Sequence, residues 1–208
     1  MRWRAVWLLY AANVTRFVVN TALVYLYVRW IETFAAARAV ETAGVSEVGI
    51  AASVLNGKFQ AAMQLGMGGA GLAAGWFVRA HHEKASLIAV PLLGAAAIGA
   101  MPLVDDLGLG HAGLIAVGLV LAVLAGVGFG GTVPTVISLA QRLLPHRTAL
   151  ASGLMMGGAW GIGFLGPPIA EAIEASRSLD AAFYATAALL LVCALLSMAL
   201  PARVIREA

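Results

Sequence analysis

Polar side chains that could bind a solute lie inside long apolar segments of this 208-residue chain. Asn13, Arg16 and Asn20 are spaced i, i+3, i+7, so on a helix they form one polar stripe. A central arginine costs about 2.5–3.5 kcal/mol to insert into a bilayer, and such residues usually face a bundle interior or a water-filled cavity. We therefore predict that Arg16 lines a cavity and binds an anionic group. The alternatives are extension of the side chain toward the membrane surface or a structural hydrogen bond to backbone carbonyls.

A second polar stripe occupies a later apolar segment. Asn56, Gln60 and Gln64 recur every four residues, so on a helix they share one face. Lys58 lies off this stripe and either lines a cavity that holds a solute, extends its ammonium group toward the membrane surface, or makes a structural hydrogen bond to backbone carbonyls. Because an amide stripe should not face lipid, we predict that both polar segments face the interior of a bundle.

A tryptophan between two glycines completes the candidate site. Trp160 is far from the helix ends where tryptophans usually mark membrane interfaces, so it either lines a pocket or packs between helices. The predicted solute-binding residues are Asn13, Arg16, Asn20, Lys58, Gln60, Gln64 and Trp160.

The sequence contains no pattern typical of catalysis or cofactor binding. Cys193 is the one cysteine, so there is no disulfide framework and no thiol metal site. The four histidines lie in loops or at helix ends, and no serine motif is paired with a histidine inside an apolar segment. A GxGxxG stretch at 126–131 lies within an apolar segment and follows no strand, which argues against a dinucleotide site. We expect no enzyme activity, no cofactor and no metal.

The elements that position these residues are membrane helices. The chain is 62% hydrophobic and 11% charged, with a mean hydropathy of +0.92, whereas soluble domains are about a quarter charged. A soluble enzyme and a nucleic-acid binder are therefore excluded as default classes. At about 20 residues per crossing, the length allows six transmembrane helices in one all-α domain spanning 1–208. The predicted helices cover approximately 4–30, 47–78, 85–104, 112–140, 148–172 and 180–200.

The charges predict the orientation of these helices. If the chain crosses six times, eight of its 13 Lys and Arg residues lie on one side, and both termini lie on that side. Cytoplasmic loops are enriched in Lys and Arg, so both termini are predicted to be cytoplasmic in an integral protein of a bacterial inner membrane. The basic net charge of +3 is then explained by the lipid bilayer as partner, and no nucleic acid is required.

Glycines four residues apart predict close contacts between helices. Small residues at this spacing let two membrane helices approach each other. The predicted packing glycines are Gly71, Gly75, Gly126, Gly130, Gly153, Gly157 and Gly161.

One block of the sequence resembles a known family. The stretches 138–145 (SLAQRLLP), 151–157 (ASGLMMG) and 159–163 (AWGIG) resemble helices ten and eleven of major facilitator superfamily transporters, with the greatest similarity to fosmidomycin-resistance-type efflux proteins. The resemblance implies that the six helices correspond to the C-terminal half of that fold, which consists of two inverted three-helix repeats. In the family, the first, second, fourth and fifth helices of each half border the cavity.

The chain departs from that family in two ways. Arg79 stands where the family has an aspartate in the loop between the second and third helices, and the six N-terminal helices of the family are missing. The resemblance therefore implies a half-size transporter subunit that pairs with itself or with a separate chain to move a small solute. The alternative is a non-transporting scaffold or assembly subunit of a larger membrane complex.

Overall fold

The protein is all helical in the part of the chain that its structure describes. The structure, a computed structural model, describes residues 2–39 and 45–201, and no strand occurs in these ranges. The predicted solute-binding and packing residues all lie within them. The α-helices are α1 (Arg2–Ala39), α2 (Val45–Phe77), α3 (Glu83–Ala100), α4 (His111–Gly130), α5 (Val133–Leu143), α6 (Thr148–Gly153), α7 (Ala159–Gly163), α8 (Gly166–Ser176) and α9 (Leu179–Met198). Short 3-10 helices cover Ala80–His82, Met101–Leu103 and Asp105–Leu107, and a π-helix covers Leu154–Gly158.

Two of the predicted helices are interrupted. The segment 112–140 becomes α4 and α5, which are separated by a turn at 131–132 and followed by Pro134 near the start of α5. A proline has no backbone N–H and is tolerated in the first turn of a helix, so a new helix begins here. The segment 148–172 becomes α6, the π-helix, α7 and α8, with a second turn at 164–165 before two consecutive prolines. Helix-breaking residues thus produced irregular backbone inside apolar segments.

Among the residues that the structure describes, four helical units are long and apolar enough to cross a membrane. They are Glu83–Leu103, His111–Leu143, Thr148–Ser176 and Leu179–Met198. The two longest helices, α1 and α2, contain 38 and 33 residues but are not among the four. These are the two helices that carry the polar stripes, and polar side chains lower the mean hydropathy of a segment. The long apolar helices are compatible with a membrane protein.

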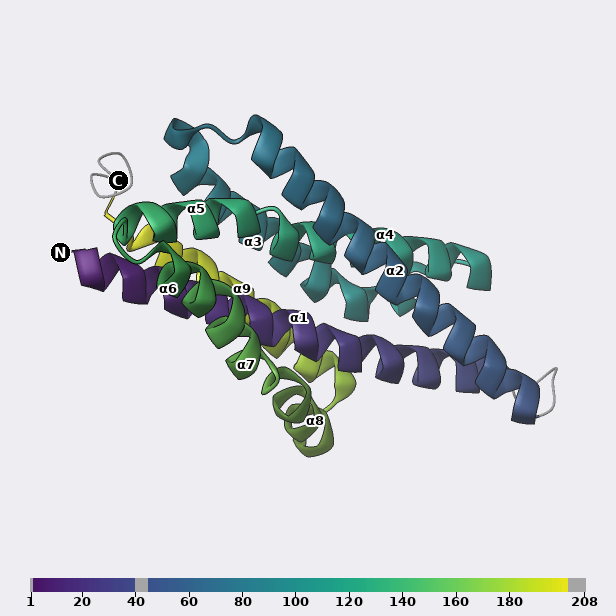
Figure 1. The fold of residues 1–208 in the computed structure, drawn as a ribbon. Helices are drawn as coiled ribbons and strands as arrows, with labels where there is room; N and C mark the ends of the chain where they lie inside the picture. The colour runs from purple at the N-terminus through teal and green to yellow at the C-terminus, as the bar shows by residue number, and fades with distance from the viewer. Residues whose placement is uncertain (1, 40–44, 202–208) are drawn as a thin grey trace.

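The helices form an elongated bundle (Figure 1). The helices α1 and α2 run antiparallel, and both ends of the described chain lie at the same end of the bundle. The most extensive contacts join α2 to α4, α3 to α9 and α1 to α9. Aromatic side chains fill the core between them: Tyr27 packs on Phe59 and Phe183, with ring centroids 5.5 and 6.4 Å apart. Burial of these rings holds α1 against α2 and α9.

Glycines allow the backbones of α2 and α4 to touch. A Cβ atom at Gly126 or Gly130 would overlap the carbonyl of Met63 or Met67 on α2, and Gly71 faces the carbonyl of Gly130. Gly66 makes the reciprocal contact, because a Cβ there would overlap the Val123 carbonyl. The predicted close approach at 71, 126 and 130 therefore occurs.

The other four predicted packing glycines do not pack closely against the described part of the chain. A Cβ atom at any of them would meet nothing within 4 Å; they are Gly75, Gly153, Gly157 and Gly161. The spacing predicts a small-residue row correctly, but it cannot tell whether a neighbouring helix lies against that row. Close contacts occur instead at glycines outside the predicted set, such as Gly94 and Gly128, which touch each other between α3 and α4.

Candidate functional site

The predicted central residue, Arg16, is enclosed by the bundle. Its side chain is fully buried, with 2% of the residue exposed. One terminal nitrogen, Nη2, donates to Oδ1 of Asn13, and Nη1 donates to the carbonyl of Phe129 over 3.4 Å. The guanidinium also lies 5.6 Å from the centre of the Phe129 ring, within the range of a cation–π contact.

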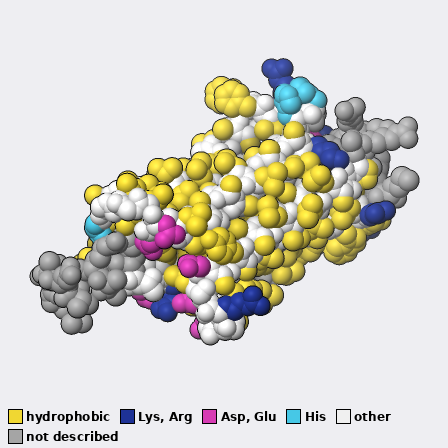
Figure 2. All heavy atoms as spheres, turned by 180° about the vertical axis from the view of Figure 1, so that it is seen from behind, with side chains coloured by type: hydrophobic (Ala, Val, Ile, Leu, Met, Phe, Trp, Pro, Cys, Tyr) yellow, Lys and Arg dark blue, Asp and Glu magenta, His cyan; other side chains and the backbone are white. Residues whose placement is uncertain are grey.

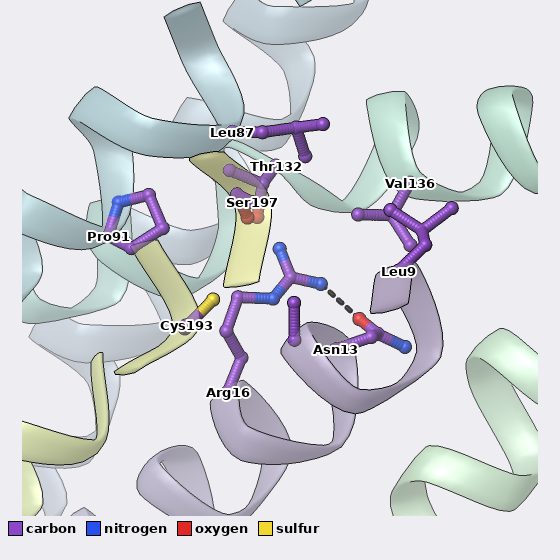
Figure 3. Close-up of a pocket in the computed structure, with 10 residues that line it drawn as sticks. Leu9, Asn13, Arg16, Leu87, Pro91, Thr132, Val136, Cys193 and Ser197 are labelled. Atoms are coloured by element: carbon purple, nitrogen blue, oxygen red, sulfur yellow. Dashed lines mark hydrogen bonds between the residues drawn. The ribbon is translucent and has the colours of Figure 1, made fainter. Parts of the chain in front are cut away.

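The space around Arg16 is small. The cavity has a volume of about 10 Å³, and its walls come from α1, α3, α9 and the α4–α5 junction (Figure 3). The polar side chains of Thr132, Cys193 and Ser197 line it together with Asn13. This volume is about the minimum for a single water molecule. The contacts of Arg16 here are those of a structural role, including a hydrogen bond to a backbone carbonyl, and the binding of an anionic group by Arg16 stays a prediction.

The rest of the first polar stripe also faces the bundle interior. Nδ2 of Asn13 donates to the carbonyl of Met155, which ties α1 to the π-helix. Asn20 is 6% exposed, and its Oδ1 atom has no hydrogen-bond partner among the described residues. The stripe therefore faces the bundle interior as predicted, and within it Asn13 joins α1 to the π-helix while none of the three residues borders an open cavity.

The second stripe is placed differently. Nε2 of Gln60 donates to the Val24 carbonyl over 3.4 Å, and Gln64 is exposed on α2. Lys58 is exposed and adjoins Phe59, whose ring lies 5.5 Å from that of Trp30 on α1 by centroid distance. Lys58 thus faces outward from the described bundle on α2, and its predicted roles stay open.

An apolar groove lies between α2 on one side and the π-helix and α7 on the other. Its volume is about 330 Å³, the size of a small-ligand pocket. Trp160 lines it, is 42% exposed, and lies 5.6 Å from the Phe17 ring by centroid distance. Of the seven predicted solute-binding residues, Trp160 is the one that lines this groove. The remaining lining residues are Phe17, Met67, Gly71, Phe129, Gly130, Val133, Pro134 and Met156.

The interruptions of the helices shape this groove. The turn between α4 and α5 brings Phe129, Gly130, Val133 and Pro134 to its floor, and the π-helix contributes Met156. Beyond the groove, Thr21 donates to the carbonyl of Gly163, which holds α7 against α1. Helix breaks satisfied in this way occur in membrane proteins where backbone borders a cavity. The glycines and prolines of the sequence could have indicated the helix breaks that shape this groove. Nothing in the sequence pattern distinguishes the phenylalanines that line it.

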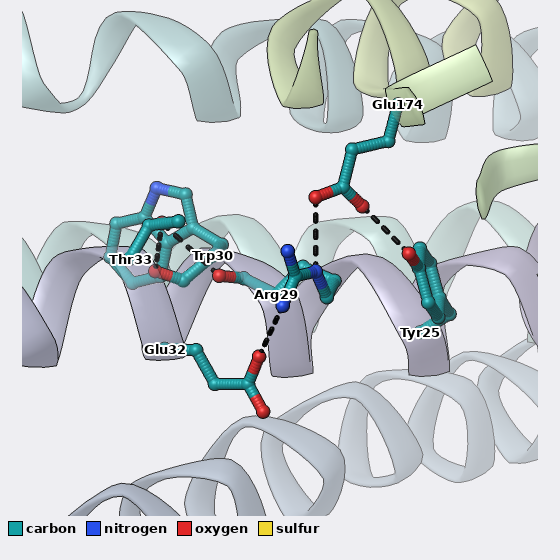
Figure 4. Close-up of polar contacts among 6 residues, drawn as sticks. All are labelled: Tyr25, Arg29, Trp30, Glu32, Thr33 and Glu174. Atoms are coloured by element: carbon teal, nitrogen blue, oxygen red, sulfur yellow. Dashed lines mark hydrogen bonds and ion pairs between the residues drawn. The ribbon is translucent and has the colours of Figure 1, made fainter. Parts of the chain in front are cut away.

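A polar pocket opens near the far end of α1. Its volume is about 570 Å³, and it lies between α1 and α8. Glu174 accepts from Tyr25 over 2.8 Å and from Nε of Arg29 over 2.9 Å, and Arg29 also contacts Glu32 at 2.6 Å (Figure 4). The cluster ties the ends of α1 and α8 together. Spacing in the sequence could not pair residues 145 positions apart.

A partly buried ion pair joins α3 to α5 at the opposite end of the bundle. Arg142 contacts Glu83 at 2.5 Å, and the Glu83 side chain is 10% exposed. Glu83 lies four residues after Arg79 and supplies the carboxylate for an ion pair at this end.

We expect Arg142→Met to lower the free energy of unfolding by about 2 kcal/mol, because it leaves the Glu83 carboxylate buried without its cation. Arg29→Met should cost about 1 kcal/mol or less, since the Arg29 side chain is 40% exposed and Glu174 keeps its hydrogen bond to Tyr25. Denaturant unfolding in mild detergent, followed by circular dichroism, compares the two. Equal losses of unfolding free energy in the two variants would contradict the prediction that the Glu83–Arg142 pair contributes more to stability.

Comparisons with known proteins identify no relative. No protein family, no curated protein and no solved structure matches the chain. Among the described residues, no group of three or more His, Cys, Asp or Glu side chains is arranged to hold a metal ion. The candidate site is therefore defined by its geometry: an apolar groove with Trp160 on one wall.

Proposed function

We propose that the chain is a half-size membrane transporter subunit of the major facilitator type, which moves a small solute by alternating access after pairing with a second half. The observation that carries this proposal is the groove of about 330 Å³, which lies open between α2 and the π-helix–α7 segment. In a transporter of this kind, the groove of one half faces that of the other, and the solute binds between them.

The two rims of the groove support pairing. Gly68 and Gly75 on α2, and Gly153 and Gly157 on the opposite rim, are exposed, and a Cβ atom added at any of them would meet nothing within 4 Å. Rows of small residues that meet nothing in their own chain are suited to close contact with a helix of another chain. The apolar lining of the groove favours an apolar or amphipathic solute over the anionic one expected from Arg16.

The contacts between helices support a repeated architecture with six crossings. At 1.5 Å per residue, α1 and α2 are long enough to cross a bilayer beside the four apolar units. Gly66 on α2 packs on α4, and Gly166, one hundred residues later, packs on α1 through Val18 and Thr21. In each case the second helix of one three-helix repeat packs on the first helix of the other. This arrangement is expected of two inverted repeats, the first beginning with α1 and the second with α4. An even number of crossings puts both termini on one side.

Cysteine cross-linking tests the pairing. In a Cys193→Ser chain, cysteines at Gly68 and Gly157 are expected to form an inter-chain disulfide in native membranes, either with a second copy or with a different chain of distinct mass. A cysteine at Leu195, which is 62% exposed on α9, is the control and should stay monomeric. Absence of any cross-link from both rims would contradict pairing through this face.

Transport is tested in proteoliposomes with a panel of small fluorescent solutes. We expect uptake or efflux of at least one amphipathic solute, and at least a several-fold slower rate for Trp160→Ala, because the indole forms part of the groove wall. Tyr184→Ala, at an exposed site on α9, is the matched control. No transport, together with co-purification of unrelated large subunits from native membranes, would instead favour the scaffold function.

A further inference from the structure

Two aromatic side chains project from the end of α2. Trp76 is 84% exposed and Phe77 is 75% exposed, and their rings stack with centroids 6.4 Å apart. They end the helix next to the loop that leads to α3. Aromatic rings in this position are unfavourable in water and are typical of the headgroup region of a membrane.

The loop beside these rings presents positive charge. Arg79, His81 and His82 are exposed, and the two imidazoles contact each other. The one acid that follows, Glu83, is buried and paired with Arg142. Because this carboxylate is neutralised inside the bundle, the outward face of the loop keeps the Arg79 charge and the imidazole N–H donors.

The two ends of the molecule differ in charge. At the end that holds this loop, the exposed charged side chains among the described residues include Arg4, Arg79 and Arg147 and no acid. Figure 2 shows hydrophobic side chains over most of one face and acidic side chains gathered near one end. The exposed acids at the other end of the described bundle include Glu32, Asp105, Asp106, Glu171 and Asp180. The end of the bundle that holds the α2–α3 loop is therefore basic, and the opposite end is acidic.

We infer that this α2–α3 loop patch, formed by Trp76, Phe77, Arg79, His81 and His82, binds the headgroup of an anionic phospholipid. The guanidinium of Arg79 can donate two parallel hydrogen bonds to a phosphate, and the imidazoles add further donors. The rings of Trp76 and Phe77 insert beside the glycerol and upper acyl region. The inference requires that the chain lies in a bilayer, but it does not require transport.

Native mass spectrometry of the protein released from nanodiscs tests the inference. Nanodiscs of phosphatidylcholine with a minor share of phosphatidylglycerol are expected to yield protein with bound phosphatidylglycerol. One basic residue near an anionic surface contributes about 1 kcal/mol, which is about a fivefold change in affinity, so Arg79→Gln should weaken binding by about that factor. Trp76→Ala should weaken it further, and Trp76→Phe should retain most of it.

Arg177→Gln is the matched control, because Arg177 is exposed at the end of α8, away from the patch. It should bind phosphatidylglycerol like the parent chain, and circular dichroism should show all variants folded. Two results would overturn the inference: Arg79→Gln and Trp76→Ala variants that bind phosphatidylglycerol like the parent chain, or displacement of the lipid by inorganic phosphate, which would indicate a site for a soluble anion.

Discussion

Alanine at Gly126 is expected to separate α2 from α4 and to lower the free energy of unfolding by about 3 kcal/mol or more. The added Cβ would overlap the Met63 carbonyl, so a backbone has to move. Overpacking usually costs about 1–3 kcal/mol, and contacts with backbone are at the upper end because no flexible side chain can relax. Steric trapping or detergent-denaturant unfolding measures the loss.

Gly157→Ala is the matched control for this experiment. Gly157 has open space around its Cα, and alanine is favoured over glycine in helices by about 1 kcal/mol, so stability should stay the same or rise slightly. Gly157→Leu should likewise leave the isolated chain folded but should reduce inter-chain cross-linking if this rim meets another helix. A Gly126→Ala variant as stable as the Gly157→Ala variant would contradict the close contact of α2 and α4.

Removal of the Arg16 side chain is expected to destabilise the bundle without altering the groove. In Arg16→Ala, Oδ1 of Asn13 loses its donor, and an orphaned buried acceptor costs about 1–3 kcal/mol, whereas the Phe129 carbonyl keeps the hydrogen bond from the Thr132 hydroxyl. The lost side chain also leaves a void, while removal of a charge from the hydrocarbon region returns about 2.5–3.5 kcal/mol. The expected net loss is about 2–4 kcal/mol in the free energy of unfolding.

Arg16→Met separates the contributions of volume and hydrogen bonding. Methionine refills most of the void, so its loss should be smaller than that of alanine. Both variants, once folded, should bind an apolar fluorescent probe in the groove with the affinity of the parent chain, whereas Trp160→Ala should weaken this binding with little effect on stability. If Arg16→Met lost solute binding while its free energy of unfolding stayed the same, Arg16 would be a solute-binding residue.

The positions of the helices could be predicted from the sequence. Apolar segments bounded by charged or glycine-containing breaks locate all of the described long helices to within a few residues, except that α1 continues to Ala39. The interruptions within the fourth and fifth predicted helices were harder to predict from the sequence. Prolines and glycines mark where a break is permitted, but whether it forms depends on partners such as Thr21, which satisfies the freed Gly163 carbonyl.

The candidate site was predicted less well, for a physical reason. Spacing assigns Asn13, Arg16 and Asn20 to one face of a helix, but it does not say whether that face meets a cavity or another helix. Trp160 was predicted with packing as an equal alternative, and the groove that it lines includes Phe17 and Phe129, which have no distinguishing pattern in the sequence.

The sequence by itself determined the all-helical class, the apolar character, the helix positions and the helix face on which each polar residue lies, because these follow from local composition and the 3.6-residue period. The tertiary structure alone decided which face is enclosed and which stays open. That outcome depends on contacts between distant residues, such as Glu174 with Arg29 and Gly126 with Met63, and no local pattern encodes the partner. For this reason the arginine lies within the bundle, and the glycine rows of α2 and of 153–157 stay on its exposed surface.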